Sequence, residues 1–142
     1  VSLTDEEIRL IQHIWSNVNV VEITAKALER VFYVYPWTTR LFTSFNHNFK
    51  ASDKQVHDHA VNVSNAISAA IGDLHDINKN FSALSTKHQK KLGVDTSNFM
   101  LLGQAFLVEL AALEKDKFTP QYHKAALKLF EVVTEALSCQ YH

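Results

Sequence analysis

The sequence predicts an all-α fold, and two observations carry that prediction. Glycine and proline together make up only five of the 142 residues, whereas a β-sandwich or barrel needs turn residues roughly every 8–12 positions. Apolar residues recur three or four positions apart along most of the chain, which is the period of a helix with one buried face. We expect six to eight helices in a single domain spanning residues 1–142, a common length for one domain.

The first helix is predicted from a capping signal and the second from helical periodicity. Thr4 with Glu7 three residues later forms a capping box, so the first helix is expected to begin there. A second helix is expected from Asn19 to Tyr35. Pro36 then either stops this helix or opens a new short helix at its first turn, where a missing N–H group does no harm.

A loop and a long helix follow. Residues 43–51 show no periodicity and are expected to form the loop. Ser52 with Gln55 makes a second capping box at the start of the helix. Six apolar residues then follow one another at spacings of three or four, which places them on one continuous face: Val56, Ala60, Val63, Ile67, Ala70 and Leu74.

Three more helices are predicted in the second half of the chain. The first ends at Gly93, the second is capped by Asp95, and the third begins at Thr119 and Pro120, a cap followed by proline at the first helical position. Their buried stripes are, in order, Phe81, Leu84, His88 and Leu92; Phe99, Leu102, Phe106, Leu110 and Leu113; and Leu127, Phe130, Val133 and Leu137.

Composition and missing motifs disfavour several classes of protein. The net charge of −1 argues against a nucleic-acid binder, whose surface is usually strongly basic. The single cysteine, Cys139, excludes an internal disulfide and indicates a reducing compartment. The polar N-terminus does not resemble a signal peptide, and no apolar run is long enough for a membrane span, so we expect a soluble intracellular protein. Nucleotide-binding fingerprints, HExxH, CxxC and GxSxG are all missing, which disfavours kinases, dehydrogenases and hydrolases.

Two of the eight histidines are expected on apolar helix faces. His59 lies three residues after Val56 and four before Val63, whereas His57 is turned by roughly 200° and should face solvent. His88 belongs to the apolar stripe of the following helix. Because a buried imidazole needs a partner, two interpretations stay open. Either backbone carbonyls satisfy each ring, or both rings face one shared ligand such as haem, which is flat, mostly apolar and takes imidazole on its iron.

Six stretches of the sequence form a specific set. They are Val34-Tyr35-Pro36-Trp37-Thr38 with Arg40, Phe42 and Phe45; Leu84-Ser85 with His88; Val94-Asp95 with Asn98-Phe99; Leu101-Leu102-Gly103; Phe118-Thr119-Pro120; and Tyr141-His142. With these stretches the chain resembles the globins, and among them the β-type chains of vertebrate haemoglobins, over its whole length. The separation of 29 residues between His59 and His88 also matches that family.

The resemblance implies a globin fold that binds haem b and carries oxygen reversibly on ferrous iron, with CO and NO as further ligands. His88 would be the proximal iron ligand. His59 would be the distal histidine beside Val63, donating a hydrogen bond to oxygen. A carrier of this kind has no catalytic residues, so the chain is not expected to be an enzyme. The rest of the haem pocket would be formed by Phe42, Phe45, Ile67, Leu84, Leu92, Val94, Phe99, Leu102 and Leu137.

The resemblance also implies a partner and a location. The chain would assemble with an α-type haemoglobin chain into an α2β2 tetramer in the erythrocyte cytoplasm, with no nucleic acid and no membrane span. Contacts between αβ dimers and the allosteric C-terminus would involve Tyr35, Trp37, Arg40, Asp95 and Asn98, and Tyr141 with His142.

Three departures from the β-type pattern change what is expected. The loop after Phe45 is about four residues shorter than usual, so a short loop should replace the small fourth helix. Lys90 stands where an aspartate usually pairs with the terminal histidine, which puts that share of the proton-linked (Bohr) effect in doubt. Organic-phosphate binding is doubtful, because the usual cations are replaced by Ser2, Asn78 and Cys139.

Three alternatives to an oxygen-transport subunit remain. A haem enzyme resembling a nitrite reductase or peroxidase would need a proton-delivery group beyond His59. A monomeric oxygen-storage globin is disfavoured by Trp37 and by the Tyr141-His142 terminus. A haem-free helical interaction module would lack the sharp Soret absorption band of haem.

Overall fold

The computed structural model describes residues 3–75 and 96–138. This part contains helices and no β-strand, so the all-α prediction is confirmed, and its eight helical segments agree with the expected six to eight. None of these helices combines the length and the apolar character needed to cross a membrane. The segments are α1 (Asp5–Ser16), α2 (Val20–Val34), the 3-10 helices η1 (Pro36–Leu41) and η2 (Thr43–Phe45), α3 (Lys54–Gly72), α6 (Thr96–Glu114), the 3-10 helix η3 (Lys115–Lys117) and α7 (Pro120–Ser138).

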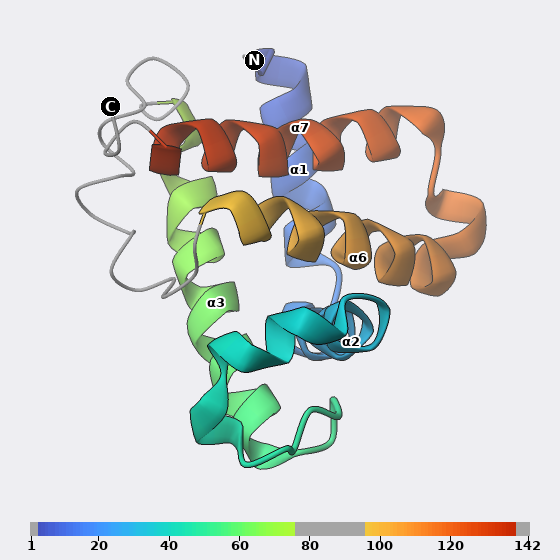
Figure 1. Ribbon diagram of the computed structural model, residues 1–142. Helices are drawn as coiled ribbons and strands as arrows, with labels where there is room; N and C mark the ends of the chain where they lie inside the picture. Colours follow the sequence, from blue (N-terminus) through green and yellow to red (C-terminus); the bar gives the residue numbers. More distant parts are fainter. Residues whose placement is uncertain (1–2, 76–95, 139–142) are drawn as a thin grey trace.

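The helices pack in crossed layers. Helices α6 and α7 run alongside each other in opposite directions, and α1 and α3 cross them (Figure 1). Helix α2 packs on both α3 and α6 and so joins these two helices. This arrangement places the buried faces of α2, α3, α6 and α7 around one common core.

Most of the predicted helix starts are confirmed. The Thr4 hydroxyl accepts from the Glu7 N–H at 3.1 Å, and the Asn19 side chain caps α2. Helix α7 begins at Pro120 as expected. The capping box predicted at Ser52 is wrong, because α3 begins at Lys54 with Asp53 as its N-cap. The Asp53 carboxylate accepts from the backbone N–H of residue 50 at 2.9 Å, which closes a turn and delays the start of the helix by one residue.

The predicted loop at residues 43–51 is confirmed as a segment without an α-helix. Its one regular part is the single 3-10 turn of η2. Two consecutive residues then adopt left-handed backbone angles, Asn46 with φ 51° and His47 with φ 64°. Both residues lie in the loop between η2 and α3.

The predicted buried faces largely form the core. All six apolar positions predicted for α3 are buried, and so are Phe99, Leu102, Phe106 and Leu110 of α6. Leu113 is a wrong prediction: it lies in the last turn of α6, just before the chain bends away through η3, and is 57% exposed.

Gly103 of α6 is required by close packing rather than by backbone conformation. A Cβ atom at this position would lie 2.7 Å from Cγ of Phe130 on α7. We therefore expect Gly103→Ala to lower the free energy of unfolding by about 1–2 kcal/mol, although alanine is the better helix former. Urea unfolding checks this. Gly72→Ala is the matched control, because a Cβ there meets nothing within 4 Å; a loss of stability as large as that of Gly103→Ala would contradict the packing argument.

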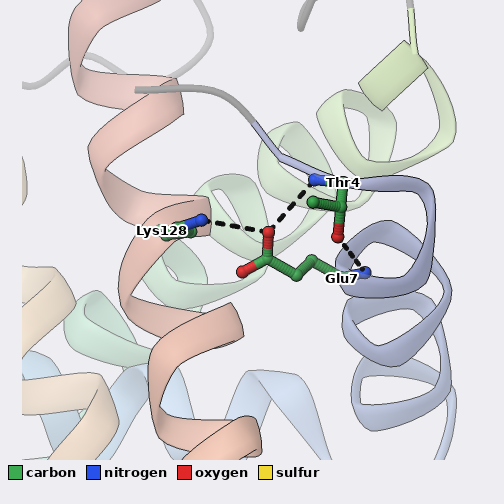
Figure 2. Close-up of polar contacts among 3 residues, drawn as sticks. All are labelled: Thr4, Glu7 and Lys128. Carbon is green, nitrogen blue, oxygen red and sulfur yellow. Dashed lines mark hydrogen bonds and ion pairs between the residues drawn. The ribbon is translucent and has the colours of Figure 1, made fainter.

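Hydrogen bonds among Thr4, Glu7 and Lys128 join the start of α1 to α7. The Glu7 carboxylate lies between Thr4 and Lys128 (Figure 2), accepting from the Thr4 N–H at 3.1 Å and from Lys128 Nζ at 3.0 Å. Burial raises the pKa of Glu7, but the hydrogen bonds from Thr4 and Lys128 lower it by more, so the pKa lies below its ordinary value of 4.5. The ionised carboxylate is therefore favoured by folding.

Glu7→Gln is expected to lower the free energy of unfolding by about 0.5–1 kcal/mol at neutral pH, a modest value because solvent screens the pair. The contribution of Glu7 is present above the ordinary pKa of 4.5 and is lost as the pH falls through the lower pKa of the folded state. Wild type and variant should thus converge in stability in acid. Urea unfolding at several pH values measures this, with Glu6→Gln, a change of an exposed neighbour, as the control. A pH-independent difference would rule out the ion pair as its cause.

Candidate functional site

The ring of His59 lies against the edges of two phenylalanine rings. Its centroid is 5.2 Å from that of Phe42 and 5.9 Å from that of Phe45, with interplanar angles of 73° and 68°. His59 comes from α3, Phe42 lies between η1 and η2, and Phe45 ends η2. These edge-to-face contacts, the geometry aromatic rings prefer, join α3 to the segment that follows α2.

The Nε2 atom of His59 is buried and has no hydrogen-bond partner in the described structure. A buried polar atom left in this state costs about 1–3 kcal/mol, so native proteins rarely keep one without a reason. Burial also lowers the pKa of His59, which keeps the ring neutral at pH 7. An unpartnered, neutral imidazole is suited to a partner that a ligand supplies. The neighbouring His57 is exposed, as predicted.

The predicted apolar residues around His59 belong to one connected core. Val63 and Ile67 lie one and two turns after His59 on α3, and both are buried. Phe99 and Leu102 of α6 are buried as well, and the Phe99 ring lies 5.6 Å from that of Phe130. Phe45 is part of the same core, and Phe42 packs against it.

This set of residues fits a haem. Phe42, Phe45, Val63, Ile67, Phe99 and Leu102 offer apolar surface to a porphyrin, and His59 offers a buried side-chain nitrogen that has no partner among the residues described. Some predicted site residues cannot be placed. Seven of the predicted site residues lie outside the described part of the chain: Leu84, His88, Leu92, Val94, Asp95, Tyr141 and His142. The side chains of Asn98 and Leu137 are not described either.

Three of the residues predicted for subunit contacts have side chains in the described part of the chain, at the end of α2 and on η1. Trp37 and Arg40 are on the surface of η1, where Trp37 keeps 49% of its area exposed. Trp37 is therefore not a core residue of the chain. Tyr35 is half-buried and packs against the core at the end of α2.

Two aromatic residues of the site were not predicted. Phe32 of α2 lies 5.2 Å from Phe42 and 6.2 Å from Phe45, and Phe49 lies 5.0 Å from Phe32. A sequence signal for Phe49 was present. Three phenylalanines, at positions 42, 45 and 49, fall within eight residues in and next to a segment that shows no helical periodicity.

Comparison with known proteins identifies the family. The family model for Globin matches residues 25–137. The chain is 94% identical to hemoglobin subunit beta-2 of Torpedo marmorata, with 100% of both chains covered. It is 51% identical to hemoglobin subunit beta of Hemitrygon akajei, covering 100% of this chain and 99% of the relative. It is also similar to the solved deoxy form of hemoglobin from Dasyatis akajei, with a TM-score of 0.88, 51% identity and 100% coverage of both chains. The chain therefore belongs to the globin family, among the β-type chains of vertebrate haemoglobins.

Proposed function

We propose that this chain transports oxygen as the β-type subunit of a haemoglobin, with His59 and His88 on opposite sides of haem b. The observation that supports the site most directly is the buried Nε2 of His59, which has no partner in the described structure. When bound, ferrous haem supplies the iron at which oxygen binds reversibly. We also propose that residues 1–142 form one globin domain.

The side chains of the proposed pocket have different roles. His88 would hold the iron through its imidazole. His59, kept neutral by burial, can carry its proton on Nε2 and donate it in a hydrogen bond to a diatomic ligand, O2, CO or NO. Val63 and Ile67 are buried and would keep water and protons away from the bound ligand, which would slow oxidation of the iron.

We infer a carrier rather than an enzyme. The residues assigned to the pocket besides His59 and His88 are all apolar. A haem enzyme that cleaves an O–O bond needs proton delivery to the oxygen atoms, and this lining favours reversible binding instead.

We propose an α-type chain as the partner in an α2β2 tetramer within the erythrocyte cytoplasm. Large apolar side chains left exposed on a single chain indicate surfaces that a partner covers. On the described residues the largest of these are Tyr33, Val34, Trp37, Leu41, Val108 and Leu113.

An oxygen-binding curve of the native assembly at two pH values tests the proposed function. A reversible sigmoidal curve is expected, together with a Soret band that shows bound haem. A hyperbolic curve would contradict the tetramer, and a missing Soret band would contradict haem binding. The size of the pH shift reports what Lys90 does to the proton linkage of His142.

Organic phosphate is expected to change the oxygen affinity little. Phosphate recognition depends on clustered cations, and the chain has Ser2, Asn78 and Cys139 where mammalian β chains carry them. Titrating inositol hexaphosphate into the native assembly while recording half-saturation checks this. A large shift of half-saturation would contradict this expectation.

A further inference from the structure

We propose that Phe49 is a positioning residue of the pocket, which holds His59 in place through the ring of Phe45. This inference rests on the proposed function, because it concerns the side of the pocket that His59 closes. It assigns a role to a loop residue that packs against the core and whose ring contacts Phe32 and Phe45.

Phe49 is joined to His59 by a series of ring contacts. Its centroid lies 5.0 Å from Phe32 and 6.0 Å from Phe45, and Phe45 lies 5.9 Å from His59. Phe49 is half-buried while the residues on both sides of it are exposed. The loop therefore turns this one side chain inward.

The backbone of the loop is shaped so that Phe49 returns to the core. Two left-handed residues, Asn46 and His47, shortly precede Phe49, and asparagine and histidine are among the non-glycine residues that adopt this conformation most often. On the other side, the backbone N–H of Lys50 donates to the Asp53 carboxylate at 2.9 Å. Phe49 thus lies between this left-handed turn and the N-cap of α3, the helix that carries His59.

Phe45 transmits this support to His59. The Phe45 ring is surrounded by Phe32 at 6.2 Å, Phe42 at 5.0 Å, Phe49 at 6.0 Å and His59 at 5.9 Å. Loss of Phe49 opens one side of this ring and lets it shift. Because His59 is itself only half-buried, a shift of Phe45 leaves its imidazole free to turn toward solvent.

The test compares three variants of the full chain in the native, haem-containing assembly. Phe49→Ala removes the ring, Phe49→Leu keeps most of its volume, and Phe118→Ala is a matched control. Phe118 is also half-buried and also contacts a histidine, His123 at 5.7 Å, but it lies at the bend before α7. Three quantities are measured: the rate of haem loss to excess haem-free myoglobin, the NMR signals of the His59 ring in the CO-saturated form, and the urea midpoint.

Phe49→Ala is expected to speed haem loss by about tenfold, the size of effect seen when outer supporting residues of a metal site are removed. Its His59 ring signals should move toward those of an exposed imidazole, because the ring-current shift from Phe45 is lost. Phe49→Leu should keep haem loss within about twofold of wild type, since volume-conserving changes are tolerated best. Phe118→Ala should lower the urea midpoint without changing haem loss or the His59 signals.

Unchanged haem loss and unchanged His59 signals in Phe49→Ala would overturn the proposal and leave Phe49 as a packing residue. Equal changes in Phe118→Ala would overturn it as well, because the effect would then follow stability alone. If Phe49→Ala does not fold, Phe49→Val carries the same test with a smaller cavity. If the wild-type protein holds no haem, the proposed function fails, and the His59 ring signals of the same variants, recorded on the haem-free chain, still decide the role of Phe49.

Discussion

Replacing His59 with leucine is expected to lower oxygen affinity by about 10- to 100-fold and, at the same time, to stabilise the haem-free chain. The affinity falls because a hydrogen bond from Nε2 to a partly negative ligand contributes about 1.5–3 kcal/mol. The stability rises by about 1–3 kcal/mol because leucine removes a buried nitrogen that has no partner in the described structure. The two effects have opposite signs and a single cause.

The stability gain should depend on pH in a definite direction. The pKa of His59 in the folded chain lies below its ordinary value of 6.5. Between these two pKa values the unfolded chain binds a proton that the folded chain does not, so wild type loses stability as the pH falls below 6.5. His59→Leu lacks this loss, and its advantage over wild type should grow in mild acid.

Two further variants distinguish the effect of the N–H donor at position 59 from the effect of the imidazole ring itself. His59→Gln keeps an N–H donor and is expected to retain most of the oxygen affinity. His57→Leu changes the exposed neighbour and should alter neither quantity. Oxygen equilibrium curves and urea unfolding of the haem-free chain at pH 5.5 and 8 provide the measurements. Equal oxygen affinity in wild type and His59→Leu would show that Nε2 does not face the ligand.

The fold could be predicted from sequence where local interactions decide it. Thr4, Asn19 and Pro120 start their helices as expected, because each cap is set by residues within one turn. The start of α3 was predicted one residue too early, since Ser52 and Asp53 are both good caps and only the bond between Asp53 and Lys50 decides between them. Periodicity also cannot show where a neighbouring helix ends, which is why the exposure of Leu113 was missed.

The site was predictable only in part, for a similar reason. Helical spacing placed His59, Val63 and Ile67 on one face, and all three lie at the core as expected. The role of Phe49 depends on left-handed angles at Asn46 and His47, and no periodic pattern records such a turn. That Nε2 of His59 has no partner among the described residues also depends on its neighbours in space rather than on helical spacing. In folded proteins nearly every buried polar group has a hydrogen-bond partner. His59 Nε2 departs from this rule within the described structure, and such departures are expected at functional sites.

Replacing Trp37 with alanine is expected to weaken the association between αβ dimers by about 30-fold or more. Trp37 keeps 49% of its area exposed on η1, so its large apolar surface is available to a partner. Tryptophan is the residue most often found at interface positions whose truncation costs about 2 kcal/mol or more. The oxygen-binding curve should lose its sigmoidal shape together with the tetramer, because cooperativity requires coupled subunits.

The exposure of Trp37 also makes this prediction specific to assembly. A half-exposed side chain contributes little to the core, so the unfolding free energy of the isolated chain should change by less than about 1 kcal/mol. Trp37→Tyr, which keeps an aromatic ring, should retain part of the affinity. Sedimentation velocity over a range of protein concentrations measures the dissociation constant. If Trp37→Ala sediments as wild type does, η1 is not the contact between dimers, and the interface must lie on another of the exposed apolar surfaces, such as the one at Val34 and Val108.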